Sequence, residues 1–220
     1  MNRCPVHIGE GGAYGCPVFR IFGDQETDAI HFFQLREDLL ALGQLRQVAD
    51  QDEIKKLFPN TYGMPVVTFE KSNEKKELPA MNVGVILSGG QAPGGHNVIA
   101  GLFDGIKANN AASRLYGFIL GPGGLIDHKY MELTADIIDE YRNTGGFDII
   151  GSGRTKLETE SQFEKGFEII KELGIKALVI IGGDDSNTNA CVLAEYYAAK
   201  KYGVQAVSYT HLTLPTNSLV

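Results

Sequence analysis

The sequence predicts an α/β protein with a Rossmann-like three-layer sandwich, in which a parallel sheet lies between two layers of helices. Two segments, residues 87–97 and 179–186, carry this prediction. Each continues an apolar run into paired glycines and then opens a helix, which is typical of a buried parallel strand that presents a phosphate-binding loop at its carboxyl end. The third observation is a regular alternation of strand-like and helix-like segments after Pro79, which calls for parallel strands joined by right-handed crossovers.

The amino-terminal 80 residues are predicted to form a helical extension. Residues 1–24 are rich in glycine and lack periodicity, so we expect a loop there. Leucines then recur three or four residues apart, which predicts an amphipathic helix over residues 27–49. A short strand is expected at residues 66–69, followed by a charged linker over residues 70–79.

The remaining chain is predicted to form most of one sheet domain. Strands are expected at residues 83–88, 116–120, 147–151, 177–181 and 204–207. Helices are expected at residues 95–108, 134–142, 159–173 and 187–201, with a loop at 121–124. Residues 208–220 contain no Asp, Glu, Lys or Arg and begin no further helix, so we expect a non-native tail. The predicted divisions are therefore 1–80, 81–207 (a partial, incomplete sheet domain) and 208–220.

Composition excludes several classes of partner. The chain has 220 residues, 43% of them hydrophobic, which is enough for a sizeable core. Its formal charge of −7 argues against sequence-independent binding to nucleic acid. We expect no membrane span and no signal peptide, hence a cytoplasmic protein. Cys4, Cys16 and Cys191 form no CxxC pair, which suits a reducing compartment, and Cys4, His7 and Cys16 lack a fourth ligand for zinc.

The two glycine loops predict one polyphosphate site at the edge of the sheet. The first loop supplies Gly89 and Gly90, and the second supplies Gly183, Asp184, Asp185 and Ser186. Two adjacent carboxylates repel phosphate, so at least one is expected to act through a cation, for which Mg²⁺ is the natural candidate. Neither loop has the spacing of a Walker motif or a dinucleotide fingerprint, which disfavours a dinucleotide-binding oxidoreductase. The alternative interpretation is a pair of tight turns that merely require glycine.

Two cations follow the strand expected at residues 147–151. Arg154 and Lys156 would meet the charge of a bound polyphosphate if they face the same edge, or else they form a solvated surface pair. His96 lies near the expected start of a helix, where the dipole disfavours an imidazolium. We therefore predict a neutral, hydrogen-bonding histidine rather than a catalytic one.

Three ordered motifs, residues 88–97, 151–154 and 182–186, together resemble the amino-terminal half of a phosphofructokinase of the long, diphosphate-dependent form. The resemblance extends over residues 57–207. It implies a glycolytic, magnesium-dependent transfer of a phosphoryl group to the 1-hydroxyl of fructose 6-phosphate, in an enzyme that is a homo- or hetero-oligomer at full length. It also implies that Gly90 contacts the donor phosphates, that Arg154 is a charge partner of the transferring group, and that Asp184 is the magnesium carboxylate.

Asp185 is the residue that bears on the choice of donor. ATP-dependent members of the family usually have Gly-Gly-Asp-Gly at this point, whereas this chain has Gly-Gly-Asp-Asp. A second carboxylate there would crowd and repel the inner phosphate of a nucleotide, which favours diphosphate. An ATP-dependent enzyme remains the nearest alternative, and a noncatalytic regulatory subunit of a heteromeric phosphofructokinase is the second.

The sequence departs from the family after residue 207. Family members continue into an aspartate-rich segment whose first carboxylate is the general base, and residues 208–215 take its place here. No catalytic residue can therefore be assigned, and we expect the chain by itself to be inactive.

Overall fold

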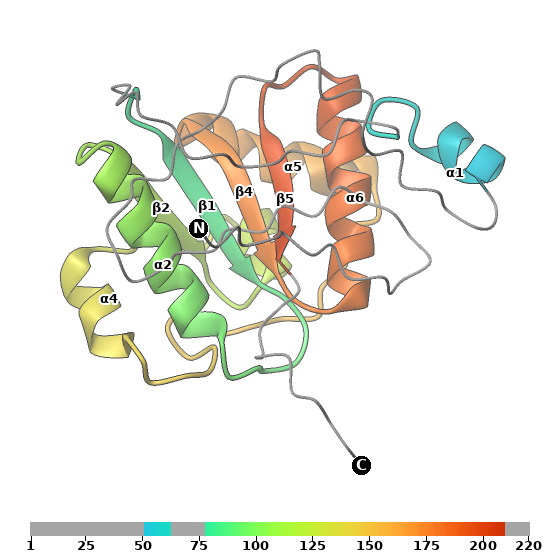
Figure 1. Ribbon diagram of the computed structural model, residues 1–220. Helices are drawn as coiled ribbons and strands as arrows, with labels where there is room; N and C mark the ends of the chain where they lie inside the picture. The colour runs from blue at the N-terminus through green and yellow to red at the C-terminus, as the bar shows by residue number, and fades with distance from the viewer. Residues whose placement is uncertain (1–50, 63–77, 210–220) are drawn as a thin grey trace, which may run out of the picture.

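The computed structural model describes residues 51–62 and 78–209. Their centre is a five-stranded sheet with the order β3-β2-β1-β4-β5 (Figure 1). The strands are β1 (Asn82–Leu87), β2 (Arg114–Phe118), β3 (Tyr130–Glu132), β4 (Ile175–Ile181) and β5 (Gln205–Tyr209). Strands β2, β1, β4 and β5 are parallel, and β3 pairs with β2 in the antiparallel sense. The predicted parallel sheet is thus confirmed for four strands, while the antiparallel β3 was not predicted.

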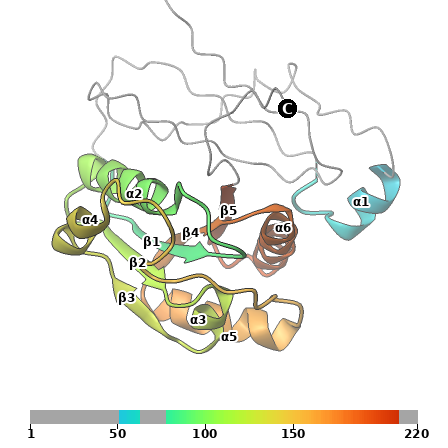
Figure 2. The same cartoon turned by 90° about the horizontal axis from the view of Figure 1, so that it is seen from below.

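Helices cover both faces of this sheet. Helix α2 (Gly95–Asn109) connects β1 to β2, and α6 (Asp184–Ala199) connects β4 to β5. Because β2 and β5 lie on opposite sides of the β1–β4 pair, right-handed crossovers must place α2 and α6 on opposite faces. Seen along the sheet, α2 lies with α4 (Ala135–Tyr141) on one side, and α3 (Pro122–Ile126) lies with α5 (Glu160–Glu172) on the other (Figure 2). The three-layer architecture is confirmed.

The central strands are apolar throughout because they are buried on both faces. Val85 and Leu87 of β1 pack in the cluster under α2 and α4. Ile86, between them, packs with residues of α5 and α6 on the opposite side. The same alternation holds in β4, where Val179 belongs to the first cluster and Ile180 to the second.

The strand expected at residues 147–151 is wrong. Phe147, Ile149 and Ile150 are buried against the α2 face, but they lie in a series of turns. Left-handed glycines flank this apolar run, and its backbone groups bond to His96 and Leu120 instead of to a strand; the glycines are Gly145, Gly146 and Gly151. Burial alone made the run apolar, and a short apolar run does not distinguish a strand from a buried turn.

Two helix starts also differ from the prediction. The expected loop at 121–124 contains the start of α3, where Pro122 occupies the first helical turn. Helix α6 begins at Asp184, three residues before the expected 187, so both carboxylates of the second loop lie in its first turn. The starts of α2 and α5 were predicted to within one residue, and Thr159 and Gln162 form a capping box at α5.

The described part of the extension lies against α6. Helix α1 (Gln51–Leu57) leads into a turn at residues 58–62. Glu195 of α6 accepts hydrogen bonds from the backbone N–H groups of Asn60 and Thr61 and from both of their side chains. Cys191 of α6 is buried and disulfide-bonded, which does not fit the reducing compartment that the cysteine spacing suggested.

The other predictions for the extension concern residues outside the described ranges. They are the helix at 27–49, the strand at 66–69 and the group Cys4, His7 and Cys16. No helix of the described residues is long and apolar enough to cross a membrane.

Candidate functional site

A cavity of about 620 Å³ opens at the carboxyl ends of β1 and β4. These two strands are neighbours at the centre of the sheet, and the chain winds from β1 toward one edge and from β4 toward the other. The loops after such a pair lead away to opposite faces and leave a crevice between them, which is where open α/β sheets bind ligands. The cavity is lined by Ser88, Gly89, Gly90, Arg154, Thr155, Lys156, Gly183, Asp184, Asp185, Ser186 and Asn189.

All eight residues proposed from the sequence line this one cavity. The glycines of the first loop, the two cations and the Gly183–Ser186 segment come from three separate regions of the chain. A Cβ atom placed on Gly90 would lie 3.6 Å from Nη2 of Arg154, so the first loop and the cation segment are in direct proximity. The structure therefore brings the predicted set together; the role of each residue stays a prediction.

The backbone of the first loop is bound to the cation segment. Gly89, at φ +93°, donates its N–H to the carbonyl of Gly153 at 2.9 Å. Ser88 and Gly153 form a parallel bridge, so the segment before Arg154 extends the sheet by one residue pair. The N–H of Gly89 is thus already hydrogen-bonded within the protein and is not free to donate to a phosphate. The left-handed conformation of Gly89 shapes the first loop.

The two glycine loops touch through serine hydroxyls. Ser186 donates its Oγ–H to Oγ of Ser88 at 2.8 Å, and both residues are buried. At Gly182 there is no room for a side chain, because a Cβ atom would lie 2.4 Å from Oγ of Ser186 and 2.5 Å from the carbonyl oxygen of Ser88. The hydroxyl of Ser186 belongs to the floor of the site, so any contact it makes with phosphate would come from its backbone N–H.

The start of α6 presents polar backbone to the cavity. Gly183 is the N-cap and has no side chain with which to cap the helix. The first N–H groups of a helix have no partner within it, and with the helix dipole they attract an anion. Asp184 and Asp185 in this turn also interact favourably with the dipole, which is the structural reason for acidic residues at this place.

Four charged side chains surround the cavity without neutralising one another. Arg154, Lys156, Asp184 and Asp185 are exposed, and none forms an ion pair with another described residue. An anion would be attracted by the first two and repelled by the last two unless a cation lies between. Within the described ranges, no group of three or more His, Cys, Asp or Glu side chains could hold a metal by itself.

Three lining residues, Ser88, Thr155 and Asn189, were not among the predicted site residues. Ser88 and Thr155 are sequence neighbours of predicted ones. Asn189 lies four residues after Asp185, which is one helical turn. Starting α6 at residue 184 instead of 187 would have placed Asn189 on the same face as Asp185.

Fold and site together define a doubly wound α/β protein with a crevice, lined by glycines and charged side chains, at the point where the winding reverses. The phosphofructokinase family model matches residues 82–211. The chain therefore belongs to the phosphofructokinase family.

Individual relatives agree with this assignment. Over 160 residues, or 73% of this chain, it is 68% identical to a pyrophosphate–fructose 6-phosphate 1-phosphotransferase of Porphyromonas gingivalis. It is 51% identical over 157 residues, 71% of the chain, to subunit beta 1 of the same kind of enzyme from Arabidopsis thaliana. The matched regions amount to 29% and 28% of the lengths of these relatives, so the chain spans less than a third of them.

The fold also matches a solved structure. A pyrophosphate-dependent phosphofructokinase from Nitrosospira multiformis superposes with a TM-score of 0.54 over 59% of this chain and 33% of that one, at 22% identity. This likeness supports the fold.

Proposed function

We propose that the cavity binds a magnesium complex of diphosphate, and that the longer enzyme containing this segment transfers a phosphoryl group from it to the 1-hydroxyl of fructose 6-phosphate. The observation that carries the proposal is the convergence on one crevice of Gly90, two cations and two carboxylates, none of which has an ion-pair partner among the described residues. Phosphoryl transfer depends mainly on positioning and charge stabilisation, and these groups supply both.

The carboxylates fit Mg²⁺ in its usual mode in phosphoryl-transfer sites. Magnesium there takes one or two protein carboxylates and completes its coordination with water and substrate phosphates. Asp184 would hold the ion, which would neutralise charge on the phosphate oxygens. Arg154 and Lys156 would bind the remaining phosphate oxygens. Asp185 would repel the inner phosphate of a nucleotide.

Diphosphate is preferred over ATP because of Asp185. The relatives described above are named for pyrophosphate, which supports the same choice. The beta-subunit name of the plant relative supports assembly of the full-length enzyme into an oligomer. A purely regulatory subunit is the weaker candidate, because a chain with no donor to bind does not require two carboxylates at this crevice.

The proton acceptor for the sugar hydroxyl lies outside this cavity. Only Asp184 and Asp185 are acidic among its lining residues, and the proposal assigns both to the donor. The base and the sugar-phosphate site would be contributed by other parts of the longer enzyme.

The test is a calorimetric titration of the 220-residue chain with diphosphate, with and without Mg²⁺. Binding should require the metal and should fall at least tenfold in Asp184→Ala. Asp127→Ala is the control, because Asp127 is an exposed aspartate whose ion pair is with Lys129 and which does not line the cavity. Equal binding by the Asp184 variant and the unaltered chain would refute the assignment.

A further inference from the structure

Asn189 forms a two-point hydrogen-bonded clamp on the backbone of Leu157. Its Oδ1 accepts the N–H of Leu157 at 3.1 Å, and its Nδ2 donates to the carbonyl of Leu157 at 2.6 Å. The side-chain amide thereby pairs with both backbone groups of one residue, as a neighbouring strand would. Leu157 follows directly on the segment that carries Arg154 and Lys156.

The clamped segment has no regular structure of its own. Residues 154–158 belong to neither helix nor strand, and Arg154, Thr155 and Lys156 are exposed. Holding such a segment in one conformation costs conformational entropy, about 1–2 kcal/mol for each residue fixed. Attachments at its two ends therefore determine where the cations lie.

The upstream end is attached at Gly153, through its bridge to Ser88 and the hydrogen bond from Gly89. The downstream end is attached at Leu157, whose side chain is buried in the core between the sheet, α5 and α6. Only three residues separate these attachments. If the clamp on Leu157 were lost, the segment would keep its attachment at Gly153 and the hydrogen bond from the N–H of Glu158 to Oε1 of Gln162, but the backbone directly after Lys156 would lose its anchor.

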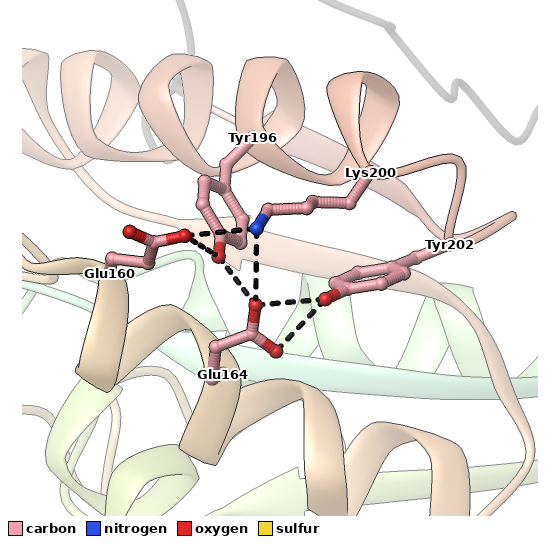
Figure 3. A network of polar contacts seen from close by, with 5 residues as sticks. All are labelled: Glu160, Glu164, Tyr196, Lys200 and Tyr202. Atoms are coloured by element: carbon pink, nitrogen blue, oxygen red, sulfur yellow. Dashed lines mark hydrogen bonds and ion pairs between the residues drawn. The ribbon is translucent and has the colours of Figure 1, made fainter.

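The helix that follows is also joined to α6. At its end, α6 presents Tyr196 and Lys200 to the first turns of α5 (Figure 3). Lys200 Nζ lies 2.9 Å from Oε1 of Glu160, and Tyr196 donates to Glu164 at 2.5 Å. Tyr202 donates to the same carboxylate at 2.8 Å. These contacts keep α5 beside α6, so the clamp at Leu157 operates between two elements that are already in place.

We propose that Asn189 is a positioning residue of the donor site, which sets Arg154 and Lys156 at a fixed distance from Asp184 and Asp185. The reason is that the clamp and both carboxylates lie on the same helix, α6, within its first two turns. The inference rests on the proposed function, because it assumes that these charges share one ligand. Asn189 need not touch that ligand; it acts through the backbone of Leu157.

The experiment uses the full 220-residue chain and magnesium diphosphate as the probe. Asn189→Ala should weaken binding about tenfold, the effect of losing two anchoring hydrogen bonds. Exchange of the Leu157 amide hydrogen should accelerate in the same variant. Asn187→Ala is the matched control: Asn187 lies on the same helix and is half-buried, but accepts a hydrogen bond from Ser208 and does not line the cavity. It should leave both readouts unchanged.

A double-mutant cycle separates positioning from a general loss of structure. In an Arg154→Ala, Lys156→Ala background, Asn189→Ala should have little further effect on binding, because the groups it positions are gone. If Asn189→Ala does not fold, Asn189→Gln decides, since it moves the amide by one methylene away from the backbone of Leu157 without adding a charge to the cavity. Absence of binding by the unaltered chain would overturn the proposed function itself. Binding that both Asn189 variants retain, or additive effects in the cycle, would overturn this inference alone.

Discussion

Asp185 is the residue that we propose selects the phosphoryl donor. Its carboxylate is exposed in the first turn of α6 and lines the cavity. In the full-length enzyme, Asp185→Gly should lower the efficiency with diphosphate and raise it with ATP, because a like charge is removed from the position of the inner phosphate. A change in discrimination of about 1–3 kcal/mol is expected for one relieved clash. The measurement is kcat/KM for both donors; an unchanged ratio would argue that Asp185 does not select the donor.

His96 is a structural residue, as the sequence predicted. It is 2% exposed, its Nε2 accepts the backbone N–H of Ile149 at 3.1 Å, and its Nδ1 lies 2.9 Å from Oγ1 of Thr144. Because the Thr144 hydroxyl donates to the carbonyl of Tyr141, it can accept a hydrogen from Nδ1. The hydrogen bonds therefore define a neutral imidazole protonated at Nδ1, which holds the turn after residue 144 to the start of α2.

This burial makes stability depend on pH. Desolvation lowers the pKa of His96 below its usual value of 6.5, although nearby Asp148 acts in the opposite direction. The unfolded chain therefore takes up a proton at a higher pH than the folded one. The stabilising contribution is complete above pH 6.5 and is lost as the pH falls through the folded pKa.

We expect thermal unfolding between pH 7.5 and 5.5 to show this loss in the unaltered chain and much less of it in His96→Gln. His128→Gln should behave like the unaltered chain, because His128 is exposed whereas His96 is buried. An identical pH profile for His96→Gln and the unaltered chain would contradict the assignment.

At the scale of elements, α6 organises the site and also carries the extension. Its first turn bears the carboxylates, its second turn clamps Leu157, and its fourth turn presents Glu195 to the turn at residues 58–62. Partial burial raises the pKa of Glu195, but the hydrogen bonds from Thr61 and Asn60 together outweigh that effect and lower the pKa below its usual value. The contact is therefore complete above the usual carboxyl pKa of 4.5 and is lost as the pH falls through the lowered value.

Glu195→Ala should release this turn from α6. We expect faster exchange of the Asn60 and Thr61 amide hydrogens and a loss of about 1–3 kcal/mol in unfolding free energy, because charged hydrogen bonds are removed. Glu140→Ala, at an exposed position on α4, should change neither. Unaltered protection of the two amides in Glu195→Ala would show that the turn is held by other contacts.

At the scale of the whole molecule, the described residues supply a donor crevice without a proton acceptor for the sugar. We therefore predict that the 220-residue chain binds magnesium diphosphate but does not form fructose 1,6-bisphosphate from it and fructose 6-phosphate at an enzymatic rate. The measurement is a coupled assay beside the calorimetric titration. Turnover that is abolished by Asp184→Ala would reveal a base that neither the sequence nor the crevice discloses.

The sequence by itself determined the layered fold and eight of the eleven residues that line the crevice. Buried parallel strands are apolar along their whole length, and the left-handed backbone at Gly89 favours glycine. The pattern of residue types along the sequence was therefore enough to locate β1, β4 and the loops that follow them. Parallel strands end at the same edge, so residues nearly a hundred positions apart could be assigned to one site.

Only the tertiary structure decided how that crevice is held together. The apolar run from Phe147 became a buried turn because His96 and Leu120 took its backbone groups in place of a neighbouring strand. Asn189 can bond to the backbone of Leu157 only because the fold brings these two residues together, although they are 32 positions apart in the sequence. Side-chain bonds of this kind depend on distances across the fold, and no local pattern of residue types encodes them.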